Sequence, residues 1–320
     1  MAIGVLAMVG LSPERLAALT AAGYAVREGK KHPNRIDAVR EAGDSVRAVL
    51  TNGRGGLSGD EMALLPQLEL VCAVGAGYEA VDLDTARSRG IAVANCPDTN
   101  APAVADSAMM LLMAATRHLR QADRHVHDGA WQDQWQVVTP TISGKRLGIL
   151  GMGTIGGKIA HRAARGFDME VGYHNRKAVA GSSYRYFDSL VALATWADFL
   201  ICAAPGGAGT RHLVNADVLT ALGPKGYVVN VGRGTVVDTA ALIDALRSKR
   251  IAGAGLDVLE GEPAVPPILP ELLQFDNVVV TPHVAGRAPE ARTAATALIL
   301  ANLNAYFSGK PLSSPVAIGQ

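Results

Sequence analysis

Three polar side chains in the second half of the sequence could together reduce a carbonyl group that lies beside a carboxylate. Arg233 lies between two glycines after an apolar run, Glu262 precedes a proline, and His283 follows another apolar run. A guanidinium binds a carboxylate through two parallel hydrogen bonds, and a histidine can donate the proton that the reduced oxygen takes up. A carboxylate beside the histidine stabilises its protonated form. Taken singly, each has an ordinary alternative: a surface turn, a loop carboxylate and a satisfied strand-end histidine. Their order at consecutive strand ends favours a joint role.

A glycine-rich turn upstream predicts where the hydride for such a reduction comes from. Gly151, Gly153 and Gly156 fit G-x-G-x-x-G between the apolar run Leu147–Leu150 and an expected helix through Lys158. In a dinucleotide site the first glycine permits the turn, the second admits the pyrophosphate, and the third lets helix and strand pack closely. The motif alone is weak in a chain with 35 glycines, and a turn without a ligand is the alternative. The strand before it and the helix after it favour a nucleotide site.

The elements that must position these residues alternate between strands and helices, which predicts α/β architecture with parallel sheets covered on both faces. Ser12-Pro13-Glu14 is a helix start, and helices are expected over Ser58–Leu64, Asp82–Arg89, Ala103–Arg120 and Pro289–Phe307. The expected strands are Ile3–Val9, Gly23–Val26, Val46–Thr51, Leu70–Val74 and Ile91–Ala94, then Leu147–Leu150, Glu170–His174, Phe199–Ala203, Tyr227–Asn230, Ala252–Leu256 and Val278–Thr281.

The nucleotide fold therefore begins near residue 101, and a length of 320 residues predicts two domains. We expect a dinucleotide-binding domain at 101–287, inserted into a substrate (catalytic) domain made of 1–100 and 288–320. The chain would cross between them at Pro97–Pro102 and at Gly286–Pro289. A cleft between domains is the default place for a site.

Composition narrows the class of protein. A formal net charge of +1, with 30 basic and 29 acidic residues, predicts binding neither to nucleic acid nor to a membrane surface. No apolar run is long enough to span a bilayer, and the N-terminus lacks the pattern of a signal peptide, so a soluble cytoplasmic protein is expected. Cys72, Cys96 and Cys202 have no metal or disulfide spacing and are expected to be buried. No metal is predicted, because no histidine pair among His118, His125, His127 and His161 has a convincing ligand geometry.

These motifs resemble the signatures of the D-isomer-specific 2-hydroxyacid dehydrogenases, in matching order and spacing over nearly the whole chain. The resemblance implies two Rossmann-like domains, a doubly wound dinucleotide-binding domain inserted into a flavodoxin-like substrate domain. It implies catalysis by Arg233, Glu262 and His283, whereas Glu260 lacks the position just before proline. Besides Arg233 and His283, it implies that the substrate contacts the backbone loop Val74, Gly75, Ala76 and Gly77. The implied cofactor-binding residues are Gly151, Gly153, Thr154, Ile155, Gly156, Asn175, Arg176, Lys177, Ala203, Pro205, Val231, Asp257, Thr99 and Val104.

One departure from the NAD-binding pattern indicates NADP. NAD-binding folds place an acidic residue at the end of the second strand to bind the ribose 2′-hydroxyl, but this strand ends in Asn175-Arg176-Lys177. Asp168 and Glu170 come too early for that role. A solvated basic turn is the alternative. The segment and Tyr184–Phe187 look most like NADPH-dependent hydroxypyruvate/glyoxylate and 2-ketogluconate reductases.

The sequence thus predicts an NADPH-dependent reductase of small 2-keto acids that yields D-2-hydroxy acids. The alternatives are an NAD-linked D-2-hydroxyacid dehydrogenase and a cofactor-sensing, corepressor-like binding protein on the same scaffold. The resemblance also implies a homodimer through Ala101–Thr141, with Trp131 and Trp135 as anchors, although ordinary packing within the chain explains those tryptophans equally well. The physiological keto acid stays open, since chain-length preference depends on Asn52–Gly56, Tyr78, the loop around Pro282–Arg287 and a partner subunit's arm.

Overall fold

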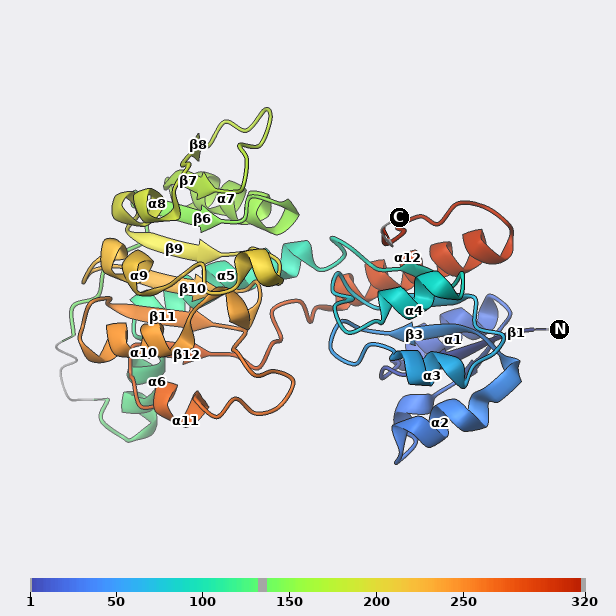
Figure 1. Cartoon of the computed structure of the whole chain (residues 1–320). Coiled ribbons are helices and arrows are strands. Elements are labelled where there is room, and N and C mark those ends of the chain that lie inside the picture. Colours follow the sequence, from blue (N-terminus) through green and yellow to red (C-terminus); the bar gives the residue numbers. More distant parts are fainter. Residues whose placement is uncertain (1, 132–136, 318–320) are drawn as a thin grey trace. The chain divides into compact units, whose positions relative to one another are not determined.

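The computed structural model describes residues 2–131 and 137–317, which form two compact units (Figure 1). Unit 1 comprises Met1–Asn100 and Arg287–Gln320, and unit 2 comprises Ala101–Gly286. Unit 2 is therefore an insertion in the sequence of unit 1.

Unit 1 is built on a parallel five-stranded sheet in the order β2-β1-β3-β4-β5, the order of flavodoxin-like folds. Side chains of α1 and α12 pack on one face of this sheet, and side chains of α2, α3 and α4 pack on the other. The strands are β1 Ile3–Ala7, β2 Tyr24–Arg27, β3 Val46–Thr51, β4 Leu70–Ala73 and β5 Ala92–Ala94, and the helices are α1 Pro13–Ala21, α2 Arg35–Ala42, α3 Gly59–Ala63, α4 Leu83–Ser88 and α12 Pro289–Phe307.

Local sequence explains where the helices of unit 1 begin. The Ser12 side chain accepts a hydrogen bond from the Arg15 amide and so caps α1, as the Ser-Pro-Glu start predicts. Asn34 caps α2 in the same way. The sequence analysis did not predict α2, because this helix buries only small apolar residues, Ala38, Val39 and Ala42, in a polar stretch.

Unit 2 is built on a parallel seven-stranded sheet in the order β12-β11-β10-β9-β6-β7-β8. Strand order reverses between β6 and β9, as in doubly wound dinucleotide folds. Side chains of α5 and α7 cover one face, and those of α8, α9, α10 and α11 cover the other. The strands are β6 Arg146–Leu150, β7 Glu170–His174, β8 Arg185–Tyr186, β9 Phe199–Cys202, β10 Tyr227–Asn230, β11 Gly253–Leu256 and β12 Val278–Val280, and the helices are α5 Ala101–Thr116, α6 Leu119–His127, α7 Thr154–Gly166, α8 Leu190–Trp196, α9 Ala216–Leu222, α10 Thr239–Arg247 and α11 Leu269–Leu272.

The predicted α/β fold class is confirmed, with two local differences. The helix expected over Ala103–Arg120 is two helices, because His118 adopts the left-handed conformation (φ 49°), which an α-helix cannot continue. The sheet of unit 2 also gains a seventh strand, β8, whose two residues are too few to show an apolar pattern. All three cysteines are buried, as predicted, and burial raises the pKa of Cys202 to about 12.

Candidate active site

The glycine turn after β6 has the shape of an anion cradle. Gly151 has a φ of 99°, and a Cβ atom on it would lie 2.7 Å from the backbone nitrogen of Ala204. A Cβ atom on Gly156 would lie 2.1 Å from the Gly151 carbonyl oxygen, so the turn and α7 pack without room for a side chain. At Gly153 nothing lies within 4 Å of such an atom, and α7 begins at the next residue, Thr154. The turn therefore leaves open space in front of helix N–H groups, which attract phosphate.

A cavity of about 860 Å³ lies beside this turn and is lined by residues of unit 2 alone. The Asn175 side-chain oxygen accepts a hydrogen bond of 2.7 Å from the Met152 amide, so the end of β7 holds the glycine turn. Arg176 and Lys177 line the same wall, and none of the described residues that line the cavity is acidic. The lining residues are Leu150, Gly151, Met152, Gly153, His174, Asn175, Arg176, Lys177, Ala203, Ala204, Pro205, Gly206, Gly209, Thr210 and Leu213.

Half of the predicted cofactor residues lie at this cavity. Thr154, Ile155 and Gly156 form the first turn of α7 instead. Val104 on α5 and Val231 after β10 are buried, and Thr99 belongs to unit 1. Asp257 is buried as well, with contacts described below. The predicted residues that line the cavity are Gly151, Gly153, Asn175, Arg176, Lys177, Ala203 and Pro205.

Sequence reasoning missed much of the wall that follows β9. In this wall the Thr210 hydroxyl donates a hydrogen bond of 2.8 Å to the Pro205 carbonyl oxygen and so closes the loop. The available signal was the run of small residues Gly206-Gly207-Ala208-Gly209 directly after a buried strand. The lining residues not predicted are Leu150, Met152, His174, Ala204, Gly206, Gly209, Thr210 and Leu213.

The Arg233 turn is held by the side chain of Asn230, the last residue of β10. Asn230 is 1% exposed; its Nδ2 donates to the Arg233 carbonyl (3.0 Å), and its Oδ1 accepts from the Gly232 amide (3.1 Å). A Cβ atom on Gly234 would lie 2.1 Å from the Leu259 carbonyl oxygen, so this turn packs backbone to backbone against the segment that leads to Glu262. This packing fixes the loop of Arg233 relative to the loop of Glu262, so that two catalytic candidates on separate loops keep a defined position relative to each other.

His283 and Glu262 form a pair, with Nδ1 of the ring 2.6 Å from the Oε2 of the carboxylate. The other carboxylate oxygen accepts a hydrogen bond of 2.8 Å from the Leu259 amide, which orients Glu262. His283 has a φ of 54°, a conformation rare outside glycine that occurs at functional sites when the surroundings enforce it.

Hydrogen bonds to Asp257 help to hold His283 in this backbone conformation. Its carboxylate accepts hydrogen bonds from the Thr281 hydroxyl (2.6 Å) and from the amides of Val284 and Ala285 (2.9 and 3.0 Å). Its carbonyl oxygen accepts from the His283 amide at 2.8 Å. In this structure the Asp257 side chain therefore holds the histidine loop.

A second histidine–glutamate pair lies in the same unit. His212 Nε2 is 2.7 Å from Glu260 Oε1, and the other Glu260 oxygen accepts from the Thr239 hydroxyl at 2.9 Å. Burial works to raise the pKa of Glu260, but the bonds from His212 and Thr239 outweigh it, so this pKa lies below its ordinary value. Glu260, two residues before Glu262, thus has a partner of its own.

The predicted substrate loop lies at the end of β4 in unit 1. The Val74 amide donates to the Thr51 carbonyl (2.7 Å), and the Cys96 amide donates to the Gly75 carbonyl (2.8 Å). Gly75 has a φ of 138°. The amides of Ala76 and Gly77 make no hydrogen bond within the part of the chain that the structure describes. Two adjacent N–H groups can together bind an anion such as a carboxylate.

Comparisons with known proteins agree with this geometry. The sequence pattern described as "D-isomer specific 2-hydroxyacid dehydrogenase, NAD binding domain" matches residues 109–285. The chain is 40% identical over 284 residues to a hydroxyphenylpyruvate reductase of Plectranthus scutellarioides, covering 89% of this chain and 90% of that one. It is 41% identical over 273 residues to a glyoxylate/hydroxypyruvate reductase of Arabidopsis thaliana, covering 85% and 86%. An NADPH-dependent glyoxylate/hydroxypyruvate reductase of Sinorhizobium meliloti, solved with NADP and malonate, superposes with a TM-score of 0.86 at 37% identity, covering 99% and 98%.

The fold and the glycine turn define a two-unit, dinucleotide-binding oxidoreductase. The chain belongs to the family of D-isomer-specific 2-hydroxyacid dehydrogenases, which confirms the resemblance noted in the sequence. Unit 2 carries the NAD binding domain of this family. Over the described ranges, no helix combines the length and apolarity needed to cross a membrane. Within 2–131 and 137–317, no group of three or more histidine, cysteine or acidic residues could hold a metal ion.

Proposed function

We propose that the protein is an NADPH-dependent reductase of small 2-keto acids, such as glyoxylate, hydroxypyruvate and 2-ketogluconate, and that it forms D-2-hydroxy acids. The observation that carries this proposal is the His283–Glu262 pair, 2.6 Å apart, in the same unit as a glycine turn and a cavity with a basic wall. Relatives that carry glyoxylate/hydroxypyruvate reductase names, and a neighbour solved with NADP, support it.

The residues of the cavity fit an NADP phosphate. Gly153 and the start of α7 would hold the pyrophosphate, because a Cβ atom at Gly153 meets nothing within 4 Å. Arg176 and Lys177 would bind the 2′-phosphate. The Asn175 oxygen is bonded to the Met152 amide, so its Nδ2 is the part of the amide that can donate to phosphate.

A bound nicotinamide supplies the hydride in this family of reactions. His283 holds the proton that the carbonyl oxygen takes up, and Glu262 stabilises the imidazolium that donates it. Arg233 orients the substrate carboxylate and polarises the carbonyl. In unit 1, the Ala76 and Gly77 amides of the Val74–Gly77 loop bind the substrate carboxylate, which makes unit 1 the substrate domain.

The cofactor distinguishes this proposal from the NAD-linked alternative. The test is steady-state turnover of the purified protein with glyoxylate, hydroxypyruvate, 2-ketogluconate and phenylpyruvate, each with NADPH and with NADH. We expect reduction with NADPH preferred. Preference for NADH would assign the protein to NAD-linked dehydrogenases, and cofactor binding without any turnover would favour the corepressor-like alternative.

We also propose a homodimer through residues 101–141. Seven of the eleven large apolar side chains that are exposed in the described residues lie between 110 and 138: Met110, Met113, Leu119, Val126, Trp131, Val137 and Val138. Trp131 is 78% exposed, which argues against packing within the chain. Trp135 lies outside the described residues. Light scattering should give twice the mass of the chain, and Trp131→Lys should lower it; a monomeric wild type would contradict the proposal.

We further propose that the protein is located in the cytoplasm. The three unpaired, buried cysteines support a reducing compartment. Cell fractionation tests it, and recovery in an oxidising compartment would contradict it.

A further inference from the structure

The loop that follows β3 packs directly against the loop proposed to bind the substrate carboxylate. A Cβ atom on Gly53 would lie 2.7 Å from the carbonyl carbon of Gly77, and one on Gly56, whose φ is 54°, would lie 1.8 Å from the Ala80 oxygen. Just beyond, Leu57 forms a parallel bridge with Val81. Residues 52–57 and 77–81 are thus in backbone contact, so a displacement of the first loop must displace the second.

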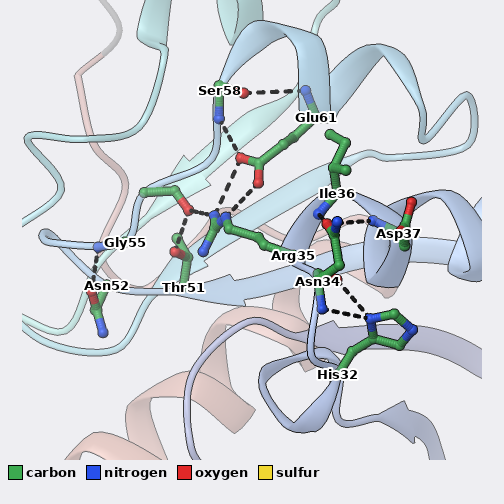
Figure 2. A network of polar contacts seen from close by, with 11 residues as sticks. His32, Asn34, Arg35, Ile36, Asp37, Thr51, Asn52, Gly55, Ser58 and Glu61 are labelled. Carbon is green, nitrogen blue, oxygen red and sulfur yellow. Dashed lines mark hydrogen bonds and ion pairs between the residues drawn. The ribbon is translucent and has the colours of Figure 1, made fainter.

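A partly buried ion pair between Arg35 and Glu61 anchors the first of these loops from the side of α2 and α3 (Figure 2). The Gly56 carbonyl oxygen accepts hydrogen bonds from Arg35 Nη2 (2.8 Å) and from the Thr51 hydroxyl. The same guanidinium binds both carboxylate oxygens of Glu61, through Nε and Nη2. Glu61 in turn accepts from the Ser58 amide at 2.8 Å. One guanidinium therefore joins the end of the loop to the helix that follows it.

Short-range hydrogen bonds also connect residues of the loop with one another. Asn52 Oδ1 accepts from the Gly55 amide (Figure 2) and from the Arg54 amide, and the Asn52 carbonyl accepts from the Gly56 amide, all within the loop. The segment carries three glycines in five residues, which have more conformational freedom than any other residue. The bond from Arg35 to the Gly56 carbonyl, which comes from outside the loop, helps to set its position.

The Glu61 carboxylate remains ionised at neutral pH. Burial works to raise the pKa of Glu61, but the bonds from Arg35 and from Ser58 outweigh it and lower the pKa below its ordinary value. The Glu61 side chain is only 9% exposed. The fork of the Arg35 guanidinium fixes direction as well as distance, because it binds both Glu61 oxygens and the Gly56 carbonyl at once.

We propose that Arg35 and Glu61 are positioning residues for substrate binding: they fix residues 52–57 and, through the Gly53–Gly77 contact, the amides of Ala76 and Gly77. This inference rests on the proposed function, because it assigns those amides to the substrate carboxylate. Both residues act through the loop that they hold, which makes them positioning residues and not catalytic ones.

The test is the double variant Arg35→Met/Glu61→Leu, which removes both charges and leaves none buried alone. The matched control is Arg47→Met/Glu69→Leu, which removes a bidentate pair (2.5 and 3.0 Å) at the other end of the same strand, β3. For both variants we would measure KM and kcat for hydroxypyruvate, NADPH affinity by fluorescence, thermal unfolding, and hydrogen exchange of residues 52–57 and 75–78.

We expect KM for hydroxypyruvate to rise about tenfold or more in the Arg35/Glu61 variant, with kcat and NADPH affinity little changed, since misplacing a binding group by a small distance costs this much. Exchange of both loops should quicken, and the control should match the wild type. Arg35→Lys should restore part of the KM, because a lysine keeps one donor but not the fork.

An unchanged KM in a folded double variant would overturn the positioning role. Equal losses in substrate binding, NADPH affinity and thermal stability would also overturn it, because that pattern is one of general damage. A wild type without keto acid turnover would contradict the proposed function and, with it, this inference.

Discussion

Unit 2 contains two histidine–glutamate pairs that resemble each other closely. His283 and Glu262 are 2.6 Å apart, and His212 and Glu260 are 2.7 Å apart. Both histidines have positive φ angles, 54° and 51°. Their side chains are 32% and 33% exposed, so exposure does not distinguish the pair proposed to be catalytic from the other pair.

The two pairs differ in which ring nitrogen of the histidine lies beside the carboxylate. His212 uses Nε2 for Glu260, and its Nδ1 faces a second carboxylate, Asp238, at 3.8 Å. Arg211 lies 3.7 Å from Glu260, so this histidine is surrounded by charged groups of the protein. His283 uses Nδ1 for Glu262, which directs Nε2 away from that carboxylate, as proton donation to a substrate requires.

Position in the fold explains the different roles. His212 lies between Thr210 and Leu213 of the cavity wall, and Glu260 precedes Glu262 by two residues. Their pair fastens the wall of the cofactor cavity to the segment that carries the catalytic glutamate. His283 lies beyond β12 in a loop that Asp257 holds. We therefore assign a structural role to the His212–Glu260 pair and the proposed catalytic role to the His283–Glu262 pair.

Loss of the two histidines should separate the pairs most strongly. His283→Ala should lower kcat by about 10²–10⁴, the usual contribution of a positioned proton donor. His212→Ala should lower kcat by less than about tenfold, because it removes one supporting bond. Steady-state kinetics of both variants, with NADPH binding measured by fluorescence, checks this. Equal losses in kcat would show that the two pairs are not functionally distinct.

Arginine variants extend the same contrast. Arg233→Lys keeps the charge but loses the planar fork, so KM should rise and kcat should fall, together by about 10–100-fold in kcat/KM. Arg211→Lys should be nearly neutral, since Arg211 contacts Glu260 only at 3.7 Å. Wild-type kinetics in Arg233→Lys would remove Arg233 from substrate binding.

The features that could be predicted from the sequence are those that a short stretch of residues determines. Glycines at 151, 153 and 156, and polar residues after buried strands, are local features, and the structure places them at one edge of the sheet of unit 2. The Leu147–Leu150 and Tyr227–Asn230 strands follow from short apolar runs and lie as expected, to within a residue.

The features that could not be predicted depend on contacts between residues that are distant in the sequence. Glu260 and His212 are 48 residues apart, and nothing near either in sequence indicates the other. The same holds for the role of Asn230 in the Arg233 turn and for the left-handed His118 that ends α5. The strand β8 exists only because β7 offers it an edge.

Substitutions in the basic wall of the cofactor cavity should have a smaller effect than those above. Arg176→Ala should weaken NADPH by about tenfold to a hundredfold and leave NADH nearly unaffected, because a charge-assisted bond contributes about 1.5–3 kcal/mol. Arg250→Ala is the control, since Arg250 pairs with Asp244 and does not line the cavity. The KM values for NADPH and NADH in both variants test this prediction. An equal rise in the two KM values of Arg176→Ala would contradict the NADP assignment.

Asn175→Asp should shift preference toward NADH. The aspartate keeps an acceptor for the Met152 amide, repels a phosphate, and offers an acceptor to a ribose hydroxyl. The ratio of kcat/KM for the two cofactors measures this shift. A variant that still prefers NADPH as strongly as the wild type would place the phosphate elsewhere.

The pH dependence of kcat in Glu262→Gln and Glu260→Gln, measured beside the wild type, tests the central claim most directly. Reduction takes up a proton, which His283 donates in the proposed mechanism, so activity should fall along an alkaline limb as the pH rises. Removing the charge of Glu262 destabilises imidazolium and should move this alkaline limb to lower pH. Glu260→Gln should leave the limb in place. An unmoved limb in Glu262→Gln, or the same displacement in both variants, would contradict the assignment of catalysis to the His283–Glu262 pair.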